Sequence, residues 1–191
     1  MFDLVSSADF YAMLVEDFDE FMAEPHSARR ALHCAITAYH LHDWVWRDWI
    51  ENDPAVQETL GVSSKRSFIR WINQRCVWFR TIADLANGTK HFIRDQCFET
   101  ARVAAAPFAF DQPHAGFDQG AWDGPIRYVA GSIPVGPQGE GYLLLDFGEG
   151  AGEQRYMTAA CLLEVVVRFW RDFFRKYQPA LNLPASRHHV S

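Results

Sequence analysis

The stretch from Ser27 to Asn52 constrains the fold of this chain most strongly. It reads SARRALHCAITAYHLHDWVWRDWIEN and is apolar around most of a helical circumference. A helix of this kind has to be surrounded by other elements, so it predicts a helical fold built around residues 27–52. One narrow polar stripe interrupts it at the spacing of a single helix face: His33, Thr37, His40, Trp44 and Arg47, with Asp43 at the edge.

Three further long segments have helical periodicity. The first is Ser7–Glu24 with Ser7 as N-cap, the next is Ser64–Asn87 with Ser64 as N-cap, and the last is Glu153–Tyr177. A short helical turn is expected at Pro54–Leu60, closed by Gly61.

Between the last two long helices the chain is rich in Gly and Pro, and its apolar runs are short. Strands are expected within Phe98–Phe110, Ile126–Ile133 and Gly141–Phe147, the last two joined as a β-hairpin by PVGPQGE. The predicted fold is therefore mainly α: an antiparallel four-helix bundle with a small antiparallel β-hairpin or sheet inserted between helices three and four. As one domain over residues 1–191, it has bundle segments 7–95 and 153–177, an insertion over 98–152 and a mobile tail over 179–191.

Charge and composition narrow the class of partner. The chain has 24 acidic and 18 basic residues, a net charge of −6, which argues against broad capture of nucleic acid or anionic membrane but leaves room for a local basic patch. No apolar run reaches the ~18 residues of a membrane span, so no membrane partner is expected. The four cysteines are far apart and the N-terminus has no signal-peptide pattern, so reduced thiols in the cytoplasm are expected.

A second polar stripe follows the segment 64–87 and continues just beyond it. Its members are Asn73, Arg80, Asp84, Asn87 and His91. If it faces the stripe of the central helix, the two form a site under the β-hairpin lined by His40, Asp43, Arg80, Asp84, Asn87 and His91, with Arg47 and Lys90 as further binding residues. Buried groups of this kind should be hydrogen-bonded to one another.

A purely structural interpretation explains the same residues. A polar face opposite an apolar face is usually the solvent side of a helix, and Arg80 with Asp84 is then an ordinary i,i+4 pair. His42 lies within the apolar face of the central helix, where a histidine is more often a core residue bonded to a carbonyl than a ligand.

A metal site is the second alternative. His40 and Asp43 are three residues apart on one helix face, and Asp84 with His91 would supply a matching pair. Such a His/carboxylate set suits a divalent transition metal, whereas the primary interpretation needs no cofactor. The glutamates that bundle metal sites usually contain are missing from both stripes.

The sequence YHLHDW, followed later by R-x3-DLANGTKHF, resembles bacterial helical proteins of the HEPN group. The resemblance implies a four- or five-helix bundle, often a homodimer, and for many members a ribonuclease of a toxin–antitoxin or defence system. It implies RNA or a protein as partner, with Arg80 and His91 as the catalytic pair. HEPN nucleases space this Arg and His four to six residues apart, whereas ten residues separate them here, so a non-catalytic protein-interaction module is the remaining alternative.

Overall fold

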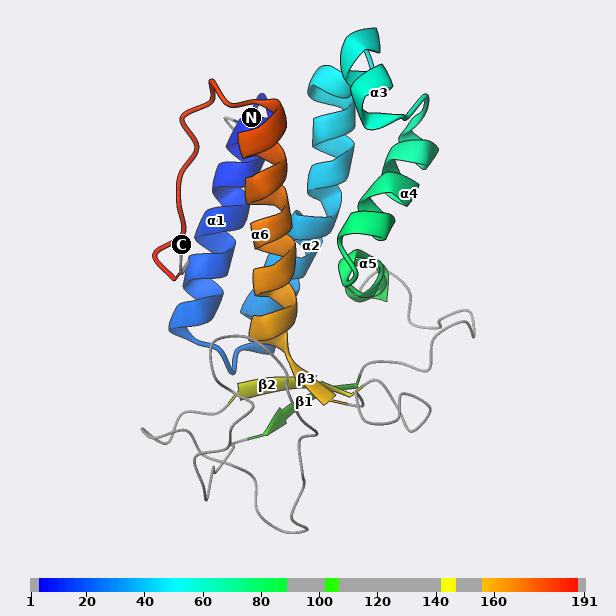
Figure 1. The fold of residues 1–191 in the computed structure, drawn as a ribbon. Helices are drawn as coiled ribbons and strands as arrows, with labels where there is room; N and C mark the ends of the chain where they lie inside the picture. The colour runs from blue at the N-terminus through cyan, green and yellow to red at the C-terminus, as the bar shows by residue number, and fades with distance from the viewer. Residues whose placement is uncertain (1–3, 89–101, 107–141, 147–155, 189–191) are drawn as a thin grey trace.

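The computed structural model describes residues 4–88, 102–106, 142–146 and 156–188, and these are mainly helical, as the sequence predicted (Figure 1). The helices are α1 (Ser7–Ala23), α2 (Ala28–Val45), the π-helical segment η1 (Trp46–Ile50), α3 (Pro54–Leu60), α4 (Lys65–Arg75), α5 (Phe79–Gly88) and α6 (Ala159–Tyr177). The strands are β1 (Arg102–Ala106), β2 (Tyr142–Asp146) and β3 (Tyr156–Thr158).

Local capping signals fix several helix ends. The prediction of a short helix at Pro54–Leu60 is confirmed, and Gly61 closes it at φ 68°, a left-handed conformation that favours glycine. Ser64 caps α4 as predicted. The predicted N-cap of α1 is wrong: Ser6, not Ser7, caps this helix in a capping box with Asp9.

The central helix is two segments rather than one. α2 ends at Val45 and continues as η1, where the Glu51 N–H donates to the carbonyl of Trp46, five residues back, at 2.8 Å. Asp48, on η1, accepts hydrogen bonds from the backbone N–H and the hydroxyl of Ser7, at 2.8 and 2.7 Å. The π-helical segment is thereby tied to the start of α1.

The single helix predicted over Ser64–Asn87 is wrong. It is broken between α4 and α5, where Cys76 has extended backbone angles and its buried side chain points inward while Val77 is 73% exposed. The break turns the chain so that Phe68 of α4 packs on Phe173 of α6, while Phe79 of α5 packs on Tyr39 of α2. Tertiary packing, which helical periodicity does not report, decides where the helix stops.

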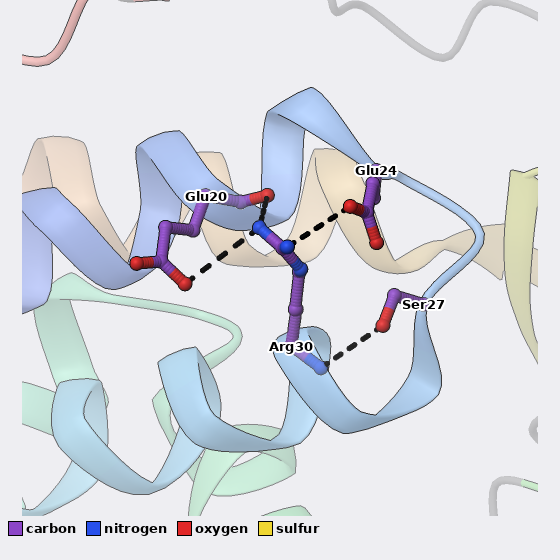
Figure 2. Close-up of polar contacts among 4 residues, drawn as sticks. All are labelled: Glu20, Glu24, Ser27 and Arg30. Carbon is purple, nitrogen blue, oxygen red and sulfur yellow. Dashed lines mark hydrogen bonds and ion pairs between the residues drawn. The ribbon is translucent and has the colours of Figure 1, made fainter.

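The connection between α1 and α2 is held by one arginine (Figure 2). The Arg30 guanidinium donates to the Glu20 carbonyl and to the Glu24 carboxylate, both at 2.9 Å, and lies 3.6 Å from the Glu20 carboxylate. The Ser27 hydroxyl accepts from the Arg30 backbone N–H, which caps α2. These contacts close the turn around Pro25 and set α1 against α2.

α2 is the hub of the packing, since α1, α5 and α6 all contact it. α6 also contacts α1, and the buried indole N–H of Trp170 on α6 donates to the Ala38 carbonyl of α2 at 2.9 Å. The side chains of Tyr11, Phe18, Leu41 and Phe174 are fully buried where these helices meet. The arrangement agrees with the apolar circumference that the sequence gives the central helix.

The three strands form one antiparallel sheet in the order β1–β2–β3, at the end of the helices where α1 turns into α2 (Figure 1). The buried Leu143 of β2 donates its N–H to the Pro25 carbonyl at 3.0 Å. β1 and β2 fall within the strand-forming stretches expected at 98–110 and 141–147, whereas Ile126–Ile133 lies outside the described residues. The predicted start of the last helix at Glu153 is wrong, because residues 156–158 form β3 and Thr158 caps α6.

The segment after α6 follows α1 as far as His188. Ser186 is buried and its hydroxyl donates to the Asp19 carboxylate, while Leu183 packs against the core. The mobile tail expected over 179–191 stays a prediction, and these contacts weigh against it for residues 183–187. Within the described part of the chain, none of the helices has the length and apolar character needed to cross a membrane.

Candidate functional site

The predicted residues His40 and Asp43 belong to a polar cluster that also contains His42 and Lys65. The Asp43 carboxylate lies 3.6 Å from His40 Nδ1 and 3.2 Å from His42 Nε2, and it forms an ion pair with the Lys65 ammonium. Lys65 opens α4, so this polar cluster fastens α4 to α2. The other nitrogen of His42, Nδ1, donates to the Tyr39 carbonyl at 2.5 Å.

The protonation of the polar cluster follows from burial and neighbouring charge. Burial lowers the pKa of His42 below its ordinary value, although the Tyr39 carbonyl and the Asp43 charge oppose that effect. Burial acts to raise the pKa of Asp43, but the Lys65 hydrogen bond, the His42 charge and the Lys65 charge outweigh it, so this pKa is lowered. Asp43 is therefore held as a carboxylate among the nitrogen groups of His40, His42 and Lys65 at neutral pH.

His42 is a structural residue in this arrangement. Its side chain is 2% exposed and its Nδ1 is committed to a carbonyl, which confirms the interpretation of a core histidine bonded to the backbone. Among the residues that the structure describes, no group of three or more His, Cys, Asp and Glu side chains is placed to hold a metal ion. The proposed metal ligand His91 lies outside the described residues, so the complete set of His40, Asp43, Asp84 and His91 stays a prediction.

The stripe predicted on the central helix is divided between two neighbours. Thr37 donates its hydroxyl to Asp17 of α1 at 2.6 Å, and Trp44 stacks on Phe10 of α1 with ring centroids 4.8 Å apart. These two side chains therefore face α1, while Asp43 faces α4. Burial raises the pKa of Asp17, although the hydrogen bond from Thr37 opposes this effect.

The other predicted site residues lie on α5, on η1 or outside the described ranges. Arg80 and Asn87 are exposed on α5, which packs on α2, and Asp84 is half-buried on the same helix. Arg47 is 76% exposed and lies 3.5 Å from the Glu51 carboxylate. Lys90 and His91 are outside the described residues, so one pocket shared by both stripes stays a prediction.

The strongest local charge in the chain is on α4 and the start of α5. We call residues 65–80 the basic segment, because it has no acidic residue and contains Lys65, Arg66, Arg70, Arg75 and Arg80. All five of these side chains are exposed. In a chain with an acidic excess, the positive potential is thus concentrated on one pair of short helices.

A groove of about 520 Å³ lies between α4 and α6, beside the basic segment. Its apolar lining is mainly aromatic and comes from Trp71, Val165, Phe169, Phe173 and Tyr177, together with Cys76 and Val77. Its polar lining is Gln74, Arg75, Arg168, Asp172 and Lys176. Burial raises the pKa of the Cys76 thiol to about 11, so this thiol is neutral and unreactive at physiological pH.

Sequence reasoning missed both the role of Lys65 and the groove. One signal for Lys65 was available, because a cation in the first turn of a helix opposes the helix dipole and needs a partner elsewhere. The presence of five basic residues and no acidic residue between 65 and 80 was equally readable. The groove joins segments about a hundred residues apart, and no local pattern predicts that pairing.

No family model, curated protein or solved structure matches this chain. The basic segment and the groove are therefore the features of the chain that indicate a function.

Proposed function

We propose that the protein is a HEPN-like helical module that binds RNA through the basic segment. The observation that carries the proposal is the set of five exposed basic side chains between residues 65 and 80, with no acidic residue among them. Phosphate contacts by Lys and Arg supply most of the sequence-independent affinity for nucleic acid. The acidic excess elsewhere repels a polyanion, so it would direct the strand to this one segment.

The proposal includes a finer architecture and setting. The helices would form the antiparallel four-helix bundle of HEPN proteins, with α4 and α5 together in one position and the β-hairpin as an insertion. The protein would be a homodimer in the cytoplasm of a bacterium, where it would serve a toxin–antitoxin or defence system. The free thiols of Cys34, Cys76 and Cys161 agree with a reducing compartment.

RNA cleavage is the catalytic part of the proposal, with Arg80 and His91 in the roles that the resemblance implies. Metal-free cleavage requires a base near the 2′-hydroxyl and a cation near the phosphate, and these two residue types provide them. Arg80 is exposed at the start of the basic segment's second helix, which agrees with a contact to a bound phosphate. Cleavage should persist in EDTA and be lost in both Arg80→Ala and His91→Ala. Activity that EDTA abolishes would instead favour the metal-dependent alternative.

The experiment that tests binding compares two double variants of equal net charge. Arg66→Ala with Arg70→Ala removes two cations from the basic segment, and Arg29→Ala with Arg187→Ala removes two exposed cations elsewhere. Exposed ion pairs contribute ~0.2–1 kcal/mol each, so the first variant should weaken binding of a single-stranded RNA by about tenfold. The second should bind like the wild type. Equal losses in the two variants would show that only net charge matters and would overturn the assignment to residues 65–80.

RNA binding without cleavage would leave the protein as a non-catalytic module. Absence of RNA binding by the wild-type chain at low salt would contradict the proposal and leave the protein-interaction alternative.

A further inference from the structure

The groove between α4 and α6 combines stacking surfaces with cations. Val165, Phe169, Phe173 and Tyr177 recur every four residues along α6, which places them on one face of that helix. Phe173 is buried beneath the groove, while Phe169 and Tyr177 are half-buried and keep part of their rings accessible. Val165 at one end of this stripe is exposed, and the two partly accessible side chains, Phe169 and Tyr177, are both aromatic.

Positive groups lie directly against two aromatic rings of the groove, one on α4 and one on α6. The Arg75 guanidinium is 4.2 Å from the centroid of a Trp71 ring, and the Lys176 ammonium is 5.0 Å from that of Tyr177. A guanidinium stacked on an indole offers its second planar face to another flat group. Aromatic rings interleaved with cations are typical of sites that bind single-stranded nucleic acid.

The groove also contains hydrogen-bonding groups that suit a base edge. Gln74 is exposed, and its amide both donates and accepts. Nε of Arg168 is buried and has no hydrogen-bond partner within the described part of the chain, although another nitrogen of this side chain is paired with Glu164. A buried donor of this kind is costly unless something accepts from it. The Asp172 carboxylate, which accepts from Arg171 at 2.9 Å, also lines the groove, and its negative charge repels a phosphate from that part of the lining.

We infer that the α4–α6 groove receives one unstacked base of the RNA strand, with the adjoining phosphate held by Arg75 and Lys176. The inference rests on the proposed function and adds a source of selectivity to it. The groove has a volume of about 520 Å³, which is within the range of small-molecule sites and accommodates a single base. A base inside a duplex is stacked and cannot enter, so the module selects single strands, bulges or ends over continuous duplex.

The test uses the full-length protein and two oligonucleotides of equal length and charge. One is a single-stranded RNA, and the other has the same sugar–phosphate backbone without bases. Base stacking on aromatic side chains corresponds to a loss of about 5- to 150-fold when it is removed. We expect the wild type to bind the base-bearing strand at least about tenfold more tightly than the abasic strand.

The variant arm removes the rings but keeps apolar volume. Phe169→Leu and Tyr177→Leu should reduce the preference for the base-bearing strand by about fivefold or more. Phe10→Leu is the matched control, a half-buried aromatic residue that stacks on Trp44 on another side of the molecule. It should leave the preference unchanged. Circular dichroism and melting confirm that each variant is folded, and Gln74→Ala at an exposed position provides a further groove variant if either Leu variant fails to fold.

The outcomes separate this inference from the proposed function. Salt-dependent binding of both strands with equal affinity, unaffected by Phe169→Leu and Tyr177→Leu, would leave the RNA-binding proposal standing and overturn the base pocket. Absence of binding to either strand would overturn the proposed function itself. A photo-crosslink from a 4-thiouridine strand to Trp71 or to the groove residues of α6 supports the inference, and crosslinks confined to residues outside the groove contradict it.

Discussion

Asp48→Ala should destabilise the protein by about 3 kcal/mol, because this carboxylate holds the start of α1. Ser7 is 2% exposed. Its backbone N–H and its hydroxyl both donate to the same Asp48 carboxylate oxygen, at 2.8 and 2.7 Å. A hydrogen bond to a charged group contributes ~1.5–3 kcal/mol, and a buried donor left without a partner costs ~1–3 kcal/mol. The negative charge near the helix N-terminus adds ~0.3–1 kcal/mol. Because Asp48 is itself exposed and water reaches part of the site, the loss in the free energy of unfolding should lie near the lower end of these ranges.

Urea unfolding followed by circular dichroism measures this loss. For a chain of this length, ~3 kcal/mol corresponds to a melting temperature lower by about 6–12 °C. Asp48→Asn keeps an acceptor oxygen and should lose less than half as much. Glu51→Ala is the matched control: it removes a carboxylate three residues away that lies 3.5 Å from the exposed Arg47, and it should change stability by less than ~0.5 kcal/mol. Equal stability of Asp48→Ala and the wild type would refute the argument that η1 anchors α1.

Three further predictions concern buried polar groups. The pKa of His42 is lowered in the folded state, so the unfolded chain binds a proton at His42 more readily as the pH falls below ~6.5. The free energy of unfolding should therefore decrease below that pH. Urea midpoints measured from pH 7.5 to 5 should decrease less in His42→Gln than in the wild type. The pKa of Asp17 is raised, so its negative charge opposes folding once the pH exceeds ~3.9. Asp17→Asn still accepts the hydrogen bond from Thr37, and its melting temperature at pH 7 should be no lower than that of the wild type. A clear decrease in melting temperature would contradict this prediction. Trp170→Phe removes a buried N–H donor to the Ala38 carbonyl and some ring volume, and should cost ~1–3 kcal/mol in urea unfolding; no loss would mean that this contact between α2 and α6 contributes little.

The parts of the fold that the sequence predicted are those with a local signal. Gly61 and Ser64 mark helix ends through their own backbone or side-chain chemistry, and both ends were predicted correctly. The apolar circumference of residues 27–52 predicted the element that three other helices contact. The core role of His42 followed from its position on an apolar face.

The errors occur where long-range packing decides. The periodicity of 64–87 continues through Cys76, yet the chain bends there because α4 packs on α6 and α5 packs on α2. Tyr156–Thr158 pairs with β2, a partner that the helical pattern of 153–177 does not reveal. The ion pair of Asp43 with Lys65 was missed, because Lys65 lies on another helix and no local pattern pairs the two residues.

The salt dependence of RNA binding shows whether the basic segment contacts phosphate groups. A cation that contacts a phosphate of a single strand contributes about 0.7 to the slope of log K against log salt concentration. Arg66→Ala with Arg70→Ala should therefore reduce the slope by about 1.4, while the matched pair Arg29→Ala with Arg187→Ala should leave it at the wild-type value. RNA binding by the basic segment predicts that difference between the two double variants. Identical slopes in all three proteins would contradict RNA binding by the basic segment.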